Sequence, residues 1–167
     1  FLSLLKEDLT NCIEEEIELE IAEKPNDFYP AVQTLDTLKI DTCLIIENPN
    51  SLKLQTLDQP TKDNFTFSNF RSLCPISSQP DWATIRISYQ GNRIEEVSLL
   101  KYLASFRNYQ AFHEDCVEII FNDLMRRCSP SILRVQANYL RRGGIEINPV
   151  RSSEIISDRI VLRDLKQ

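Results

Sequence analysis

Residues 71–82 read RSLCPISSQPDW, so Cys74 and Asp81 lie seven residues apart, with Pro75 after the thiol and Pro80 before the carboxylate. A free thiol with a pKa of about 8.5 is only partly ionised at neutral pH, so a cysteine nucleophile needs a base or a positive neighbour. A nearby carboxyl group could take that proton or deliver one to a substrate atom. A single cysteine is more often a small buried apolar residue. Because Cys74 lies outside any helical periodicity, in a loop restrained by proline, we predict that it is a nucleophile with Asp81 as its acid or base.

His113 is the one histidine of the chain, and Glu114 follows it at the start of a predicted helix. A lone histidine near a helix N-terminus is usually a surface residue or one with satisfied hydrogen bonds. An imidazole beside a carboxylate at the N–H end of a helix could instead read the donor and acceptor edge of a heterocycle. We favour this binding function only if the fold brings Cys74 and His113 together.

The sequence RRGG at residues 141–144 is typical of a hairpin turn with a basic tip. Arg142 beside the N–H groups of Gly143 and Gly144 could also hold a phosphate group. The chain has neither a G-x-G-x-x-G motif nor a P-loop. A dinucleotide would therefore bind without a Rossmann domain.

Two other interpretations use the same residues. Cys74, His113 and Cys116 could be three zinc ligands, since the last two are three residues apart on a helix and a catalytic zinc keeps a fourth position open. The absence of a C-x-x-C pair or a second histidine disfavours this zinc-dependent hydrolase. A cysteine hydrolase could use Cys74 as nucleophile and His113 as base, with Asp81 or Glu114 orienting the imidazole.

Composition limits the partners and the compartment. The 167 residues are 42% hydrophobic, enough for a buried core, and the net charge of -6 does not favour nucleic acid as a partner. Five cysteines without a C-x-x-C pair indicate free thiols in a reducing, cytoplasmic compartment. No window reaches the roughly 18 apolar residues of a membrane span, and no signal peptide is evident, so we expect no membrane partner.

The first third of the chain reads as a helix followed by strands. Apolar spacing predicts a helix over residues 1–12, and alternation predicts strands at 17–21 and 38–46 around a loop at 25–35. We interpret residues 48–69 as a linker with a short strand near 53–58.

The rest of the chain has a clearer pattern. The predicted order is a strand at 85–89, a turn at 90–92, helices at 97–106 and 112–127, and a hairpin of 133–139 with 145–147. This order predicts an α+β fold in which two helices cover one face of an antiparallel sheet. The apolar row of the strand at 17–21 begins five residues after Cys12, at the end of the first helix, and the row of the strand at 133–139 begins five residues after Cys128. This equal spacing indicates a second, incomplete copy of the unit, although it could equally be chance.

Four motifs resemble one known family. They are CPISSQPDW at 74–82, SFRN at 105–108, FHEDC at 112–116 with FNDL at 121–124, and RRGGIEINP at 141–149. The family is that of the NADPH-dependent 7-cyano-7-deazaguanine reductases, the nitrile reductases of queuosine biosynthesis, a tRNA modification. The resemblance implies the tunnelling fold, with a four-stranded antiparallel sheet and two helices on one face.

The resemblance also implies a role for each site residue. Cys74 would attack the nitrile carbon of 7-cyano-7-deazaguanine to give a covalent thioimide, and Asp81 would donate protons as NADPH delivers hydride twice. His113 and Glu114 would bind the deazaguanine. Arg142 and Gly143 would contact NADPH.

One part of the family pattern is missing. The Glu-Ser-Lys-Ser cofactor motif would fall at residues 96–102, which read EVSLLKY, whereas two-module members carry that motif in their first half. Since the chain also starts at Phe1 inside a predicted helix, we expect the C-terminal part of a two-module enzyme that forms a homodimer. The expected units are 1–47, the end of a first module; 48–69, a connection; and 70–167, the catalytic module. A purine-binding fragment that cannot reduce its ligand is the alternative.

Overall fold

The computed structural model describes residues 2–19, 33–40, 49 and 54–156. Its elements, in chain order, are α1 (Leu2–Ile13), β1 (Gln33–Thr34), the 3-10 helix η1 (Leu35–Thr37), β2 (Thr56–Leu73), β3 (Pro80–Ile94), α2 (Glu96–Ala104), the 3-10 helix η4 (Ser105–Asn108), α3 (His113–Cys128), β4 (Ile132–Tyr139) and β5 (Val150–Ser152).

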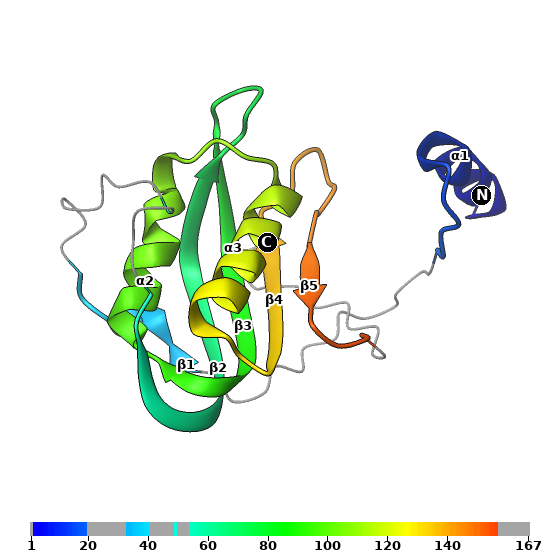
Figure 1. Ribbon diagram of the computed structural model, residues 1–167. Helices are drawn as coiled ribbons and strands as arrows, with labels where there is room; N and C mark the ends of the chain where they lie inside the picture. Colours follow the sequence, from blue (N-terminus) through cyan, green and yellow to red (C-terminus); the bar gives the residue numbers. More distant parts are fainter. Residues whose placement is uncertain (1, 20–32, 41–48, 50–53, 157–167) are drawn as a thin grey trace.

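The strands form one sheet in the order β1-β2-β3-β4-β5. The neighbours from β2 to β5 pair antiparallel, and the two-residue β1 pairs parallel with β2. Helices α2 and α3 lie side by side over one face of this sheet (Figure 1). The α+β prediction is therefore confirmed. The described sheet has five strands rather than four, because β1 adds a short edge that no sequence pattern indicated.

The core lies between the helices and the sheet. Alternate residues of the paired strands β2 and β3, such as Phe65, Ile85 and Ile87, point into it. From α3, Ile120 and Leu124 complete the same cluster, as the helical spacing predicted. Burial of these large side chains supplies most of the stabilising free energy of a domain of this size.

The ends of the two helices also follow the sequence. Glu95 caps α2 by accepting hydrogen bonds from the backbone N–H groups of Val97 and Ser98. At its C-terminus, α3 carries Arg126 and Arg127 in the last turn, where the helix dipole favours cations. Ser129 then ends the helix with a φ of 48°.

Three predicted elements differ from the structure. Strand β2 runs over 18 residues where we expected a short strand in a linker. The strand tolerates Pro60 because this residue lies at a register shift near the exposed end of the strand. Gly91 is not in a turn but inside β3, where a Cβ atom would lie 2.9 Å from the Cα atom of Pro130. The partner of β4 is β5, not residues 145–147.

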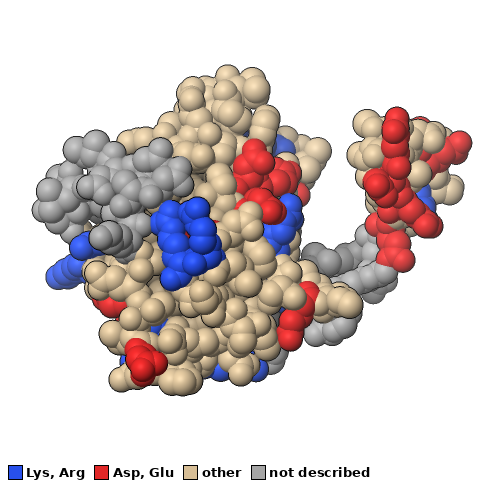
Figure 2. Space-filling model, in the orientation of Figure 1, with Lys and Arg blue, Asp and Glu red and all other residues tan. Residues whose placement is uncertain are grey.

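The N-terminal third agrees only in part. Helix α1 is present, but none of its residues is buried, and residues 16–19 have no regular secondary structure. The remainder of the predicted strand at 17–21 lies outside the described residues, and so do residues 41–46 of the strand predicted at 38–46, of which 38–40 are not in a strand. Figure 2 shows acidic side chains along α1 and basic ones over the region of α2 and α3. No helix in the described part of the chain is long and apolar enough to cross a membrane.

Candidate active site

Cys74 is the first residue of the six-residue loop that joins β2 to β3. Its N–H donates to the carbonyl of Gln79 at 2.9 Å, and its carbonyl accepts from the N–H of Ser78 at 2.9 Å. Ser78 has a φ of 56°, in the left-handed region. The loop is thus closed by its own backbone hydrogen bonds, which fix the position of the thiol relative to the two strands.

The surroundings of Cys74 favour the thiolate. A hydrogen bond from the Ser77 side chain lowers the pKa of the Cys74 thiol, with further lowering from the backbone N–H groups of Ser77 and Ile76. The negative charge of Asp81 has a smaller effect in the opposite direction and raises the pKa of the thiol. The thiol is partly exposed, so a substrate could reach it.

The segment before α3 is fastened to the strand end next to Cys74. The N–H of Leu73 donates to the carbonyl of Tyr109 at 2.9 Å, and the N–H of Ala111 donates to the carbonyl of Leu73 at 3.1 Å. Gln110 adds a side-chain hydrogen bond to Ser78 at 2.9 Å. These contacts hold the first turn of α3, and with it His113, beside the loop.

Asp81 lies in strand β3, where it pairs with Ser72 of β2, and not in the loop as the sequence suggested. Only 6% of the residue is exposed. Its Oδ1 atom lies 2.5 Å from Nη2 of Arg142 and 3.3 Å from Nε2 of His113. A buried carboxylate needs such partners to compensate the loss of hydration. The structure therefore brings Asp81, His113 and Arg142 together at the edge of the sheet that carries Cys74.

The imidazole of His113 is held flat against Tyr139 of β4. The two ring centroids are 3.8 Å apart and the planes differ by 6°. The Nδ1 atom of His113 is buried and has no hydrogen-bond partner among the described residues. The ring is thus oriented with Nε2 toward Asp81, and its other nitrogen is left without a partner among the described residues.

Beneath this ring lies a buried polar cluster that sequence reasoning missed. Cys116, Tyr139 and Ser72 are all fully buried, and the side chains of Tyr139 and Ser72 lie close enough to Cys116 to influence the pKa of its thiol. Burial raises the pKa of the Cys116 thiol and raises that of the Tyr139 hydroxyl well above its usual value. In the sequence, Tyr139 was interpreted only as an apolar core residue of a predicted strand. The one signal for a place in the site is its position two residues before the RRGG turn.

The remaining predicted site residues are less enclosed. Glu114 is exposed in the first turn of α3 and makes no hydrogen bond or ion pair within the described ranges. Gly143 and Gly144 have φ values of 58° and 84°, in a tight turn closed by reciprocal 3.0 Å hydrogen bonds between Arg142 and Ile145. This turn directs the Arg142 side chain toward Asp81, while no atom lies within 4 Å of the Cβ position of either glycine.

Two predicted binding features can be checked against this geometry. In the described residues, no three His, Cys, Asp or Glu side chains are grouped as metal ligands, so Cys74, His113 and Cys116 do not form the zinc set. The N-terminus of α2 does not fit a cofactor phosphate, because Glu95 already occupies the N–H groups of Val97 and Ser98, at 3.1 and 2.5 Å. At the Arg142–Gly144 turn, the two glycines leave room for a phosphate beside the backbone.

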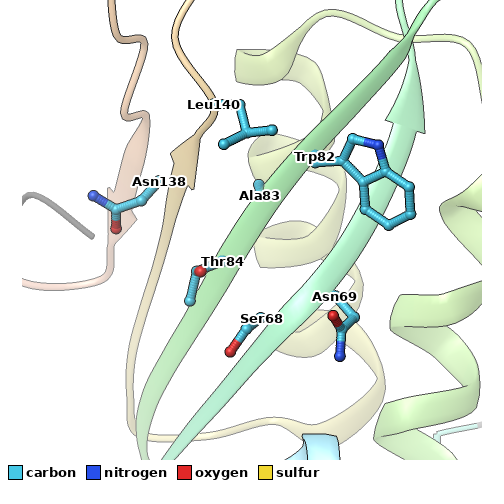
Figure 3. A pocket seen from close by; sticks show the side chains of 7 residues that line it. All are labelled: Ser68, Asn69, Trp82, Ala83, Thr84, Asn138 and Leu140. Atoms are coloured by element: carbon cyan, nitrogen blue, oxygen red, sulfur yellow. The ribbon is translucent and has the colours of Figure 1, made fainter. Parts of the chain in front are cut away.

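A pocket of about 270 Å³ lies on the face of the sheet that helices α2 and α3 do not cover. Figure 3 shows its side chains on β2, β3 and the end of β4, with the helices behind the sheet. The indole of Trp82 rises at one end of this pocket, and Thr84 and Asn138 form the polar part of its floor. Because Trp82 follows Asp81 directly, one strand end presents an acid to one face and an aromatic pocket to the other.

Comparison with known proteins gives a consistent result. Residues 80–157 match the family model of QueF-like proteins. The NADPH-dependent 7-cyano-7-deazaguanine reductase of Verminephrobacter eiseniae is 45% identical over 72% of the chain and 43% of its own length. The reductases of the same name from Coxiella burnetii and Buchnera aphidicola are 40% and 39% identical over 89% and 92% of the chain, and 54% and 60% of their own lengths. The chain thus spans about half the length of these curated relatives, from 43% to 60%.

A solved structure supports the fold. The archaeosine synthase QueF-Like, in its apo form, matches 61% of the chain and 99% of its own length with a TM-score of 0.50 at 17% identity. At this identity the likeness concerns the fold alone, and it confirms the predicted tunnelling fold.

Proposed function

Because the chain belongs to the family of NADPH-dependent 7-cyano-7-deazaguanine reductases, we propose that it carries the catalytic thiol of a nitrile reductase in queuosine biosynthesis. The observation that carries this proposal is the convergence of a thiol of lowered pKa with a buried, paired carboxylate. We also propose that the enzyme is cytoplasmic and that its two-module chains form a homodimer.

The proposed first step uses Cys74 and Asp81 together. The Asp81 carboxylate takes the thiol proton, and the Cys74 sulfur forms a bond to the nitrile carbon. One π pair of the C–N triple bond moves to nitrogen, which receives the proton back from Asp81, so the product is a neutral thioimide. The two groups must reach opposite ends of one C–N bond, which explains why a closed loop and a paired strand hold them.

The neighbours of Asp81 have distinct parts in this step. Arg142 compensates the buried carboxylate charge before the thiol proton arrives. His113 would donate from Nε2 to Asp81, and its stacking on the Tyr139 ring keeps that orientation. Glu114, exposed beside it, would accept a hydrogen bond from the deazaguanine edge.

Two molecules of NADPH, bound one after the other, would each supply one hydride, and together these would convert the thioimide to the amine and release Cys74. Of the chain's own residues, Arg142 and Gly143 would contact the cofactor, at the open turn described above. The capped N-terminus of α2 offers no second contact. This favours the alternative that the chain by itself captures the ligand without reducing it.

Intact mass after addition of 7-cyano-7-deazaguanine without NADPH tests the proposal. We expect a gain of one ligand, absent in Cys74→Ala and retained in Cys12→Ala, which removes an exposed thiol on α1. An adduct that persists in Cys74→Ala would assign the nucleophile to another thiol. Loss of NADPH absorbance after NADPH is added to that mixture would then separate a reductase from a binding unit.

A further inference from the structure

A second cavity, of about 430 Å³, lies away from the thiol, between η1, strand β2 and helix α2. The buried side chains of Leu35, Phe67 and Leu100 provide apolar walls. None of the residues grouped around Cys74 lines it. The volume lies in the range of small-molecule sites, roughly 300–1,000 Å³.

The charges around this cavity are unbalanced. Lys39, Arg71 and Arg107 line it, against a single carboxylate, Asp36. That carboxylate is already engaged, since it accepts from the N–H and hydroxyl of Ser68 at distances of 2.8 to 3.1 Å and from other neighbouring groups. In a chain with a net charge of -6, three cations gathered on one cavity, whose single carboxylate is engaged elsewhere, indicate a site for an anion.

The cations have no partners within the described ranges. Lys39 and Arg107 make neither a hydrogen bond nor an ion pair there. Arg71 contacts the ring of Trp82, with its guanidinium carbon 5.8 Å from the centroid, but its Nε atom is buried without an acceptor. A buried donor left unpaired costs free energy, so an acceptor supplied by a ligand would remove that cost.

We propose that this cavity binds a phosphate-bearing ligand with an apolar body, the chemistry of a nucleotide. Two guanidinium groups and an ammonium suit phosphate oxygens, since arginine binds them in bidentate fashion. The apolar walls suit a ring rather than a bare anion. The proposal does not depend on chemistry at Cys74, and its test needs no turnover.

Calorimetric titration of the 167-residue chain tests the site with three probes: adenosine 2′,5′-bisphosphate, ADP and inorganic pyrophosphate. We expect a nucleotide to bind at least tenfold more tightly than pyrophosphate, and the double variant Lys39→Gln, Arg107→Gln to weaken it at least tenfold. Lys101→Gln is the matched control, because Lys101 is an exposed cation of α2 that does not line the cavity. Circular dichroism checks that each variant is folded.

Either nucleotide binding in this way supports the proposal, and the preference identifies the source. Tighter binding of adenosine 2′,5′-bisphosphate than of ADP would identify the phosphate-bearing half of NADPH as the ligand. Equal binding of the two probes would indicate that the ligand is another nucleotide. The proposal is overturned if neither nucleotide binds below millimolar concentration, or if the control loses as much affinity as the double variant. Pyrophosphate binding as tightly as the nucleotides would overturn the role of the apolar walls.

Discussion

The sheet edge around Cys74 and the core between α2 and α3 satisfy their polar groups very differently. In the core, the Tyr102 hydroxyl donates to buried Asp123 at 2.9 Å, and Arg126 and Arg127 pair with the same carboxylate. At the edge, a buried nitrogen of His113 has no partner within the described residues, and the thiol is partly exposed with a lowered pKa. The difference teaches that one region stabilises the fold while the other is arranged for a ligand.

Replacement of Cys74 by alanine gives the largest expected effect on chemistry and almost none on stability. Covalent capture of the nitrile and turnover should both be abolished, because no other described thiol is exposed in the site. The midpoint of urea unfolding should stay the same, since the side chain is only partly buried. A large fall in that midpoint would show that the edge also stabilises the fold.

Phe106→Ala should give the reverse pattern. The ring is fully buried and contacts Phe70 and Tyr102, with centroids 5.5 Å away in both pairs. Truncation of such a side chain costs about 3–5 kcal/mol in the free energy of unfolding. Urea denaturation measures the loss, and Phe112→Ala, at a residue 52% exposed, is the control expected to change it little. Similar losses in both variants would contradict this division.

Gly91→Ala tests the close approach of β3 to the chain after α3. A Cβ atom 2.9 Å from the Pro130 backbone forces a local shift, for which we expect a loss of about 1–3 kcal/mol in unfolding free energy. Asn92→Ala, at the exposed neighbouring position, should change it by less than about 0.5 kcal/mol. Equal stability of the two variants would mean that Pro130 moves without cost.

Ser77→Ala should produce the smallest change, a shift in pH dependence. The Ser77 hydroxyl is the largest cause of the lowered pKa of Cys74, so its loss should raise that pKa. The thiolate is the reactive form. At pH values below the pKa, Cys74 should therefore react more slowly with iodoacetamide in the variant, and the curve of alkylation rate against pH should move to higher pH. Peptide mass mapping follows this site, with Ser131→Ala as a distant control. An unchanged curve would assign the lowered pKa to the backbone N–H groups.

The sequence predicted the parts of the molecule that depend on local pattern. Helices α2 and α3 follow from apolar spacing, and β4 from alternation. The pairing of Cys74 with Asp81 was predicted from residue type and spacing. Whether His113 lies beside them was left open by the sequence, and the roles assigned to all three residues stay predictions.

What the sequence could not predict depends on long-range pairing. Strand β2 looked like a linker because Pro60 disfavours a strand, yet its pairing with β3 extends past that residue. Gly91 looked like a turn, although its small size serves a contact with Pro130, far along the chain. Likewise, the stack of Tyr139 on His113 joins a strand to a helix and leaves no local signature.

The two backbone hydrogen bonds of Leu73 have a consequence for observing this site. They join the end of β2 to the segment that leads into α3, so the amide protons of Leu73 and Ala111 are protected by the same pair of segments. Opening of either segment would expose both protons to solvent, and their deuterium uptake should rise together. These two amides therefore report, in the absence of any substrate, whether the thiol and the imidazole are held beside each other.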